Sequence, residues 1–152
     1  DVLDQASMDS RLSSLEPARL FAELTVNDRK ELAALTTEKR FGPGEAIVSQ
    51  GQSVAELYVI VSGRVHISGT ASNESSGVEE VEIGPGACVG LSAALEQSNS
   101  SVTAKAIDSV STLCITWDQL NELFGYDKEI ASRFWRAAAA ELSQQLPGTK
   151  RV

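Results

Sequence analysis

The chain has 152 residues, of which 42% are hydrophobic and 22% are charged, as in an ordinary soluble globular domain. Its formal net charge of −8 argues against direct contact with nucleic acid, because a phosphate-binding surface is basic. No apolar run reaches the roughly 18 residues of a membrane-spanning helix and no signal-peptide pattern begins the chain, so we expect a cytoplasmic domain without direct membrane insertion.

Two helices are predicted near the N-terminus. Apolar residues recur at helical spacing from Glu16 onward, which predicts a short first helix. Thr25 or Asn27 is expected to cap a second helix, whose inner face carries Leu32 and Leu35.

The middle of the chain consists of short, β-branched segments bounded by Gly, Pro, Ser or Asn. Their turn signals recur about every 8–12 residues, which predicts an antiparallel sandwich or barrel. The polar segment 69–77 lies between two of them and is expected to form a flexible hairpin loop. The predicted strands are Ala46–Val48, Glu56–Val61, Arg64–Ile67, Val78–Ile83, Val102–Ala106 and Val110–Ile115.

Helical periodicity returns in the last third of the chain. Thr116 or Asp118 is expected to cap a helix over Trp117–Phe124. A longer helix over Lys128–Leu146 carries one apolar stripe at a spacing close to four residues. The order of helices, then short strands, then helices describes a mainly β domain with flanking helices.

Three glycine turns follow one another in a fixed order: Phe41–Glu45 (FGPGE), Leu57–Val65 (LYVIVSGRV) and Ile83–Gly90 (IGPGACVG). Each turn alone is a weak signal, because Gly and Pro punctuate every β protein. The ordered set resembles the cyclic nucleotide-binding domain family. That resemblance implies an eight-stranded antiparallel jelly roll, or β-sandwich, with N-terminal helices and a C-terminal lid helix. It divides the chain into a linker or N-terminal extension (1–15), a cyclic nucleotide-binding-like domain (16–146) and a tail (147–152).

In this family a phosphate cassette of the form F-G-E-(L/M)-A-L, followed by R-(S/T)-A, comes after the last of these turns. Aligned without gaps, Leu91 stands where the family has its ribose-binding Glu, and Ser100 where it has its phosphate-binding Arg. A nest of backbone N–H groups can remain, but Leu91 accepts no hydrogen bond and Ser100 carries no charge. The resemblance implies that ligand contacts, where present, come from Gly90, Leu91, Ser92, Ala93, Ser100, Ser101 and Val102.

The resemblance also makes the last helix a lid that swings onto the nucleotide base and transmits occupancy. Its candidate lid residues are Arg133, Phe134 and Arg136. Because Phe134 and Trp135 are adjacent, they point in different directions; one is expected to face the sandwich and the other solvent, a partner or a ligand base. Of the two interpretations, plain packing of a terminal helix is favoured over the lid. The cations that could replace the missing Arg in space are Arg64, Lys105, Arg133 and Arg136.

Catalytic and metal-binding chemistry is not indicated. His66, the only histidine, lies between two apolar strand residues and is expected to face solvent or to be satisfied locally. Cys88 and Cys114 lie in apolar segments and are expected to be buried, reduced thiols. We therefore expect no enzyme, no metal and no cofactor, with cAMP or cGMP as a candidate ligand.

Three functions compete. The first is a degenerate module with weak or absent cyclic nucleotide binding, favoured by Leu91 and Ser100. The second is a true sensor for cAMP, cGMP or another small anion, which gates its host through the C-terminal helix. The third, a metal-dependent cupin-like enzyme, needs clustered histidines that this chain lacks. By resemblance to channels and transporters that carry this domain after their membrane part, the expected partner is an effector in the same polypeptide, with homo-oligomerisation through that host.

Overall fold

The computed structural model describes residues 21, 24–70, 78–91, 99–100 and 102–145. The predicted extension 1–15, the start of the first helix, most of the loop 69–77 and the tail 147–152 lie outside these residues.

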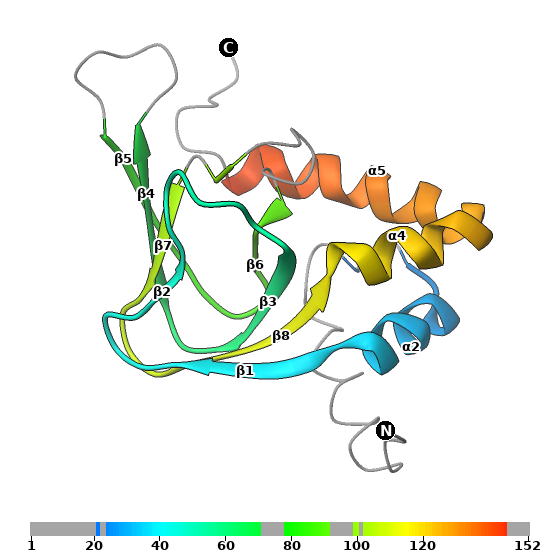
Figure 1. Cartoon of the computed structure of the whole chain (residues 1–152), viewed down its shortest axis with the longest axis horizontal. Coiled ribbons are helices and arrows are strands. Elements are labelled where there is room, and N and C mark those ends of the chain that lie inside the picture. The colour runs from blue at the N-terminus through cyan, green and yellow to red at the C-terminus, as the bar shows by residue number, and fades with distance from the viewer. Residues whose placement is uncertain (1–20, 22–23, 71–77, 92–98, 101, 146–152) are drawn as a thin grey trace.

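The body of the molecule is a sandwich of two four-stranded antiparallel sheets (Figure 1). Sheet A has the strand order β1-β8-β3-β6 and sheet B the order β2-β7-β4-β5, so consecutive strands often lie in different sheets. The predicted mainly β jelly roll is confirmed. The strands are β1 (Thr37–Phe41), β2 (Ala46–Val48), β3 (Glu56–Ser62), β4 (Val65–Thr70), β5 (Val78–Ile83), β6 (Cys88–Val89), β7 (Val102–Ala106) and β8 (Val110–Thr116).

Three described helices, α2 (Val26–Leu35), α4 (Trp117–Tyr126) and α5 (Lys128–Gln145), lie together on one side of the sandwich (Figure 1). Of the predicted caps, the structure selects Thr25 and Thr116. Each closes a capping box, because the third helical residue, Asp28 or Gln119, bonds back to the cap. Within the described ranges, no helix is both long and apolar enough to span a bilayer.

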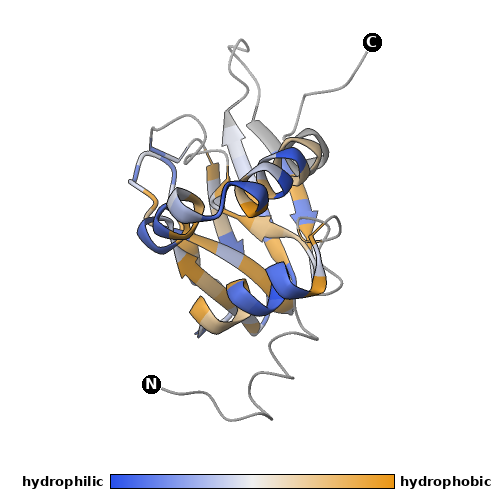
Figure 2. Ribbon diagram, turned by 90° about the vertical axis from the view of Figure 1, so that its right-hand side faces the viewer, coloured by the Kyte–Doolittle hydropathy of each residue, from blue (hydrophilic) through white to orange (hydrophobic). Residues whose placement is uncertain are grey.

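Two apolar cores share sheet A. Along β3, Leu57 and Val59 point to the helices, whereas Tyr58 and Ile60 point between the sheets. We call the first cluster the helical core and the second the sandwich core. Because both faces of β3 are covered, its sequence is a continuous apolar run rather than an alternating one. Figure 2 shows this concentration of hydrophobic residues on the strands behind the helices.

Two strands were not among the predicted segments. The first, β1, reads TEKRF and is an edge strand whose residues are mostly exposed, so it has no apolar alternation to detect. The second, β6, has only two residues and exists because it pairs with β3 at Tyr58 and Val59.

The two cysteines occupy opposite faces of sheet A. Cys88 pairs with Val59 and belongs to the helical core, while Cys114 pairs with Tyr58 and belongs to the sandwich core. Both are buried and neither forms a disulfide, as predicted. A bond between them would have to cross the sheet.

Candidate functional site

The turn before the cassette is fixed by backbone hydrogen bonds to β3. The Gly86 N–H donates to the Ile60 carbonyl at 2.9 Å, and the Ile60 N–H donates to the Ala87 carbonyl at 2.9 Å. Gly86 has φ +94°, a left-handed conformation that favours glycine. The GPG sequence therefore directs the chain into β6 and onward to the cassette.

The β2–β3 loop (residues 49–55) holds the cassette at both ends. At one end, Gly90 has φ +103°, and a Cβ there would lie 2.6 Å from the Glu56 carbonyl oxygen and 3.2 Å from Val54 Cγ1. At the other end, Ser100 donates its N–H to the Gln52 carbonyl and accepts from the Gly51 N–H, each at 2.8 Å. The loop thus forms a wall against which both ends of the cassette lie.

The two positions that differ from the family pattern are both occupied by groups with local roles. Leu91 is 1% exposed and lies in the helical core, on the opposite side of sheet A from the sandwich core. The Ser100 hydroxyl donates to the Val102 carbonyl at 2.7 Å and accepts from the Val102 N–H at 3.2 Å, so its single hydrogen is used. Ser92, Ala93 and Ser101 lie outside the described residues.

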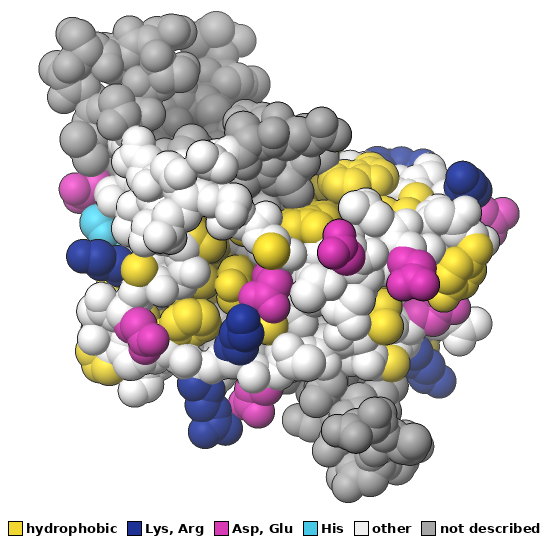
Figure 3. All heavy atoms as spheres, viewed as in Figure 1, with side chains coloured by type: hydrophobic (Ala, Val, Ile, Leu, Met, Phe, Trp, Pro, Cys, Tyr) yellow, Lys and Arg dark blue, Asp and Glu magenta, His cyan; other side chains and the backbone are white. Residues whose placement is uncertain are grey.

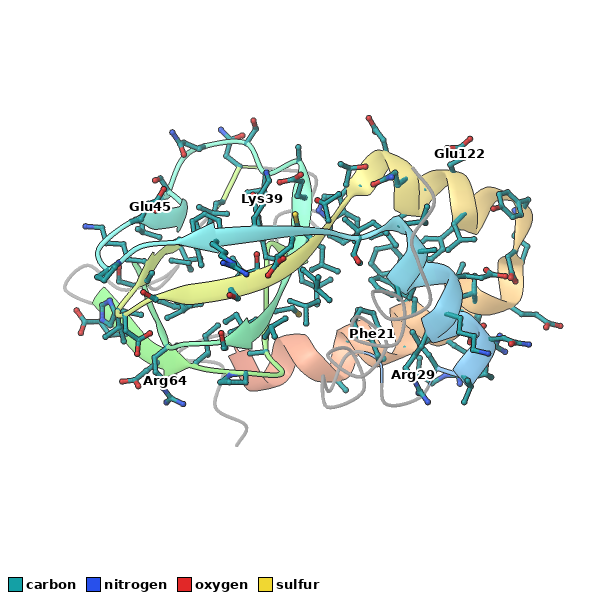
Figure 4. The ribbon with its side chains drawn as sticks, turned by 90° about the horizontal axis from the view of Figure 1, so that it is seen from below. Phe21, Arg29, Lys39, Glu45, Arg64 and Glu122 are labelled. Atoms are coloured by element: carbon teal, nitrogen blue, oxygen red, sulfur yellow. The ribbon has the colours of Figure 1, made fainter. Side chains whose placement is uncertain are left out.

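None of the four candidate cations is buried between the sheets. Arg64 donates to Glu82 at 2.6 Å, and Figure 4 places it at the end of the molecule opposite α2 and α4. Lys105 alternates with the buried Ala104 and Ala106, so it lies on the outer face of sheet B. Arg133 bonds to Asp28 in the helical layer, and Arg136 is exposed on α5.

A fifth cation, which no sequence motif indicates, lies on β1, the edge strand of sheet A. Lys39 on β1 pairs with Thr112, on the same face of sheet A as Ile60 of the sandwich core. Its Nζ donates to Glu56 Oε1 at 2.8 Å, and the Tyr58 hydroxyl donates to the same oxygen at 2.9 Å. In Figure 3, hydrophobic side chains are visible in a hollow between the sheets, and Figure 4 labels Lys39 on β1.

Glu56 neutralises this cation. The hydrogen bond to Glu56 raises the pKa of Lys39. Burial tends to raise the pKa of Glu56, but the hydrogen bonds from Lys39 and Tyr58 outweigh it and the pKa is lowered. Burial and the neighbouring carboxylate both raise the pKa of Tyr58. The three groups satisfy one another, so Lys39 does not offer an unpaired charge to an anion.

The aromatic residues of α5 are held by the helical layer. Phe134 is fully buried in the helical core, and its ring centroid lies 5.1 Å from that of Phe124. Trp135 stacks on Trp117 of α4, with ring centroids 6.2 Å apart and planes 7° from parallel. The two adjacent rings thus differ in burial: Phe134 is enclosed, whereas Trp135 packs on α4 and remains partly exposed, and its proposed contact with a partner or a base stays a prediction.

His66 is half-exposed on the outer face of sheet B, with Nε2 3.4 Å from Glu80 Oε1. This agrees with its predicted place on a solvated strand face. In the part of the chain that the structure describes, no three His, Cys, Asp or Glu residues gather as metal ligands would.

Solved structures from several organisms share this fold. A cyclic nucleotide-binding domain from Methylobacillus flagellatus KT matches with a TM-score of 0.75 at 15% identity, covering 91% of this chain and 77% of that one. The N-terminal domain of a transcriptional regulator from Streptomyces coelicolor A3(2) matches with a TM-score of 0.69 at 24% identity, covering 86% and 91%.

The same fold recurs inside longer proteins. The regulatory subunit of a cAMP-independent protein kinase A from Trypanosoma brucei matches with a TM-score of 0.72 at 20% identity. That match covers 92% of this chain but 48% of the subunit, so the chain spans about half of that protein. A family model described as "Cyclic nucleotide-binding domain" matches residues 38–127, more than half of the chain. The chain therefore belongs to the cyclic nucleotide-binding domain family.

Proposed function

We propose that this domain regulates a larger protein through contacts of its helical layer, and that it binds cyclic nucleotides weakly or not at all. The observation that carries the proposal is the pairing of the candidate cations: among the described residues, Lys39 is bonded to Glu56, Arg64 to Glu82 and Arg133 to Asp28, so none of these three offers a free charge to a phosphate. The placement of Leu91 in the helical core supports it further, since an apolar side chain there contributes no acceptor for a ribose hydroxyl.

The expected loss of affinity is large. A hydrogen bond to a charged group contributes about 1.5–3 kcal/mol, so loss of the arginine contact lowers affinity by about one to two decades. A cyclic phosphate left without a counter-charge also keeps its desolvation penalty. A site of micromolar affinity is expected to fall towards millimolar.

We infer that the host is a membrane channel or transporter, whose cytoplasmic part holds this domain and whose assembly brings copies of it together. The acidic net charge of −8 supports a protein contact rather than nucleic acid as the direct partner. Enzymatic activity forms no part of the proposal, because the family is a regulatory one.

Calorimetric titration of the domain with cAMP and cGMP to millimolar concentration tests the proposal, with 5′-AMP as a control for nonspecific binding. Guanosine is included, because a regulatory subunit from Trypanosoma cruzi is described as bound to it, and a nucleoside needs no cation for a phosphate. We expect flat titrations with both cyclic nucleotides. Saturable micromolar binding of cAMP or cGMP, absent with 5′-AMP, would overturn the proposal in favour of a functional sensor.

A matched variant tests the physical reason for weak binding. Ser100→Arg restores the cation that the family pattern places there, while Ser100→Gln adds a side chain of similar length without the charge. The arginine variant alone is expected to gain affinity for cyclic nucleotides, by about 10- to 100-fold if the restored contact is charge-assisted. Equal affinity of the two variants would show that the missing charge is not what limits binding.

A further inference from the structure

The first turn of α2 and the second turn of α5 are joined by one ion pair between residues 105 positions apart in the sequence. Arg133 Nε donates to Asp28 Oδ2 at 2.6 Å, and Arg133 Nη2 donates to Asp28 Oδ1 at 3.0 Å. Both carboxylate oxygens are engaged, which is the two-pronged geometry that arginine favours. The Asp28 side chain is 7% exposed and that of Arg133 is 29% exposed, so solvent screens the pair little.

The carboxylate is positioned by α2 itself. Asp28 Oδ2 accepts the Thr25 N–H at 3.0 Å, and Thr25 Oγ1 accepts the Asp28 N–H at 3.0 Å. This reciprocal capping box fixes the Asp28 side chain whether or not α5 is in place. The strength of the hydrogen bonds to Arg133 therefore depends on whether the first turn of α2 is formed.

The buried residues of α5 that the structure describes also pack in the helical layer. Its fully buried residues, Ile130, Phe134 and Ala138, belong to the helical core. Trp135 stacks on Trp117 of α4. No described side chain of α5 belongs to the sandwich core. These described contacts of α5 are all made within the protein.

We propose that Asp28 and Arg133 form a latch that fastens α5 to α2, so that α2, and not a ligand in the sandwich, sets the docked position of α5. A signal that reaches or leaves the domain through its N-terminal helix is then transmitted to α5 across this latch. The latch acts whether or not the sandwich binds a nucleotide, so it goes beyond the function proposed above.

Hydrogen exchange of the wild-type domain and four variants, read by mass spectrometry over α5, β3 and β8, tests the latch. Arg133→Gln removes the cation, and Arg133→Lys keeps the charge without the fork. Thr25→Ala weakens the capping box of α2 without touching α5. Arg64→Gln is the control, because it removes a more exposed arginine–carboxylate pair of the same 2.6 Å length, between the β3–β4 turn and β5.

In Arg133→Gln we expect α5 amides to exchange about 10- to 100-fold faster, the loss expected for a charge-assisted pair, while β3 and β8 stay protected. Arg133→Lys should show a smaller increase, and it tests the latch by itself should the glutamine variant not fold. Thr25→Ala should raise the exchange rate of α5 amides about 2- to 30-fold, because loss of an N-cap side chain destabilises the start of a helix by an equivalent factor. Arg64→Gln should leave α5 unchanged.

Three results would overturn the latch. One is unchanged α5 exchange in the Arg133 variants. Another is faster exchange of α5, β3 and β8 in equal measure, which reports global stability alone. The third is unchanged α5 exchange in Thr25→Ala when Arg133→Gln responds, which removes α2 from the coupling.

A parallel arm with 1 mM cAMP separates this proposal from the proposed function. Restored α5 protection in Arg133→Gln would mean that a ligand docks the helix, which contradicts both proposals. Unchanged α5 exchange on adding cAMP, together with the expected variant pattern, supports both. Saturable cAMP binding in the calorimeter without an effect on α5 exchange would contradict the proposed function while leaving the latch intact.

Discussion

Leu91 provides the sharpest test of how the cassette is built, because the family pattern places a ligand-binding Glu at this position. In the structure its side chain is 1% exposed and belongs to the helical core rather than the sandwich core. Leu91→Glu should therefore not restore a ribose contact. It should place a carboxylate among apolar residues beneath the helices.

The expected penalty has two parts. Losing the burial of a leucine side chain costs about 1.5–3 kcal/mol, and an unpaired buried carboxylate adds several kcal/mol unless it takes up a proton. We expect a loss of about 4 kcal/mol or more, a large share of the roughly 5–15 kcal/mol that stabilises a typical domain. Leu91→Met, which conserves volume and polarity, should cost less than about 1.5 kcal/mol.

Urea denaturation of wild type, Leu91→Glu and Leu91→Met at pH 4.5 and pH 7.5 measures both parts. Burial raises the pKa of a carboxyl above its unfolded value, so the folded glutamate variant binds a proton more tightly than the unfolded chain. Its penalty is therefore smallest at low pH and grows as the pH rises. A glutamate variant as stable as the methionine variant at both pH values would refute the burial of this side chain in the helical core.

Three further predictions follow from single contacts. Gly90→Ala should lower the free energy of unfolding by about 1–3 kcal/mol, because Gly90 has a positive φ and a Cβ there would meet the Glu56 carbonyl. Gly44→Ala is the control: Gly44 also has a positive φ but has open space around it, so this variant should lose less stability. Thermal denaturation of the two variants measures the difference. The hydrogen bond from Arg133 lowers the pKa of Asp28 below 3.8, so stability from this pair is present above that pH and lost as the pH falls through the lowered pKa. Arg133→Gln should remove the contribution of this pair to the pH dependence of stability. The difference in free energy of unfolding between wild type and variant, measured by urea titration, should therefore narrow below pH 3.8. A difference that stays constant there would contradict the role of the Asp28–Arg133 pair. The two buried thiols should react with a thiol reagent only on unfolding, and rapid labelling of the native domain would contradict their burial.

The fold was predictable wherever local chemistry and burial agree. The apolar run of β3 predicts a strand covered on both faces, and Thr25 followed three residues later by Asp28 marks the start of α2. β1 was not predictable, because an edge strand with exposed charges leaves no pattern of burial in its sequence.

For the candidate site, the sequence predicts which positions align with the family's ligand contacts, but not where their side chains lie. The sequence indicates that Leu91 and Ser100 stand where the family has its charged ligand contacts, but the chain does not reveal which core Leu91 enters. That depends on the turn at Gly90, whose positive φ reverses the simple alternation of faces after β6. The Asp28–Arg133 pair had no sequence signal either, since the two residues are brought together by the packing of whole helices.

In this domain the stability of the fold is separate from ligand binding, whereas the family pattern combines the two. The glycine turns, the β2–β3 loop and sheet A are held together by backbone hydrogen bonds and by apolar burial, and none of these contacts needs a ligand. The helical layer is likewise closed by its own ion pair and aromatic stack. A domain built in this way can lose its cation and its ribose acceptor without losing its fold, because neither group supports the packing. On the function proposed above, a partner that contacts α2 and α5 would not require a nucleotide.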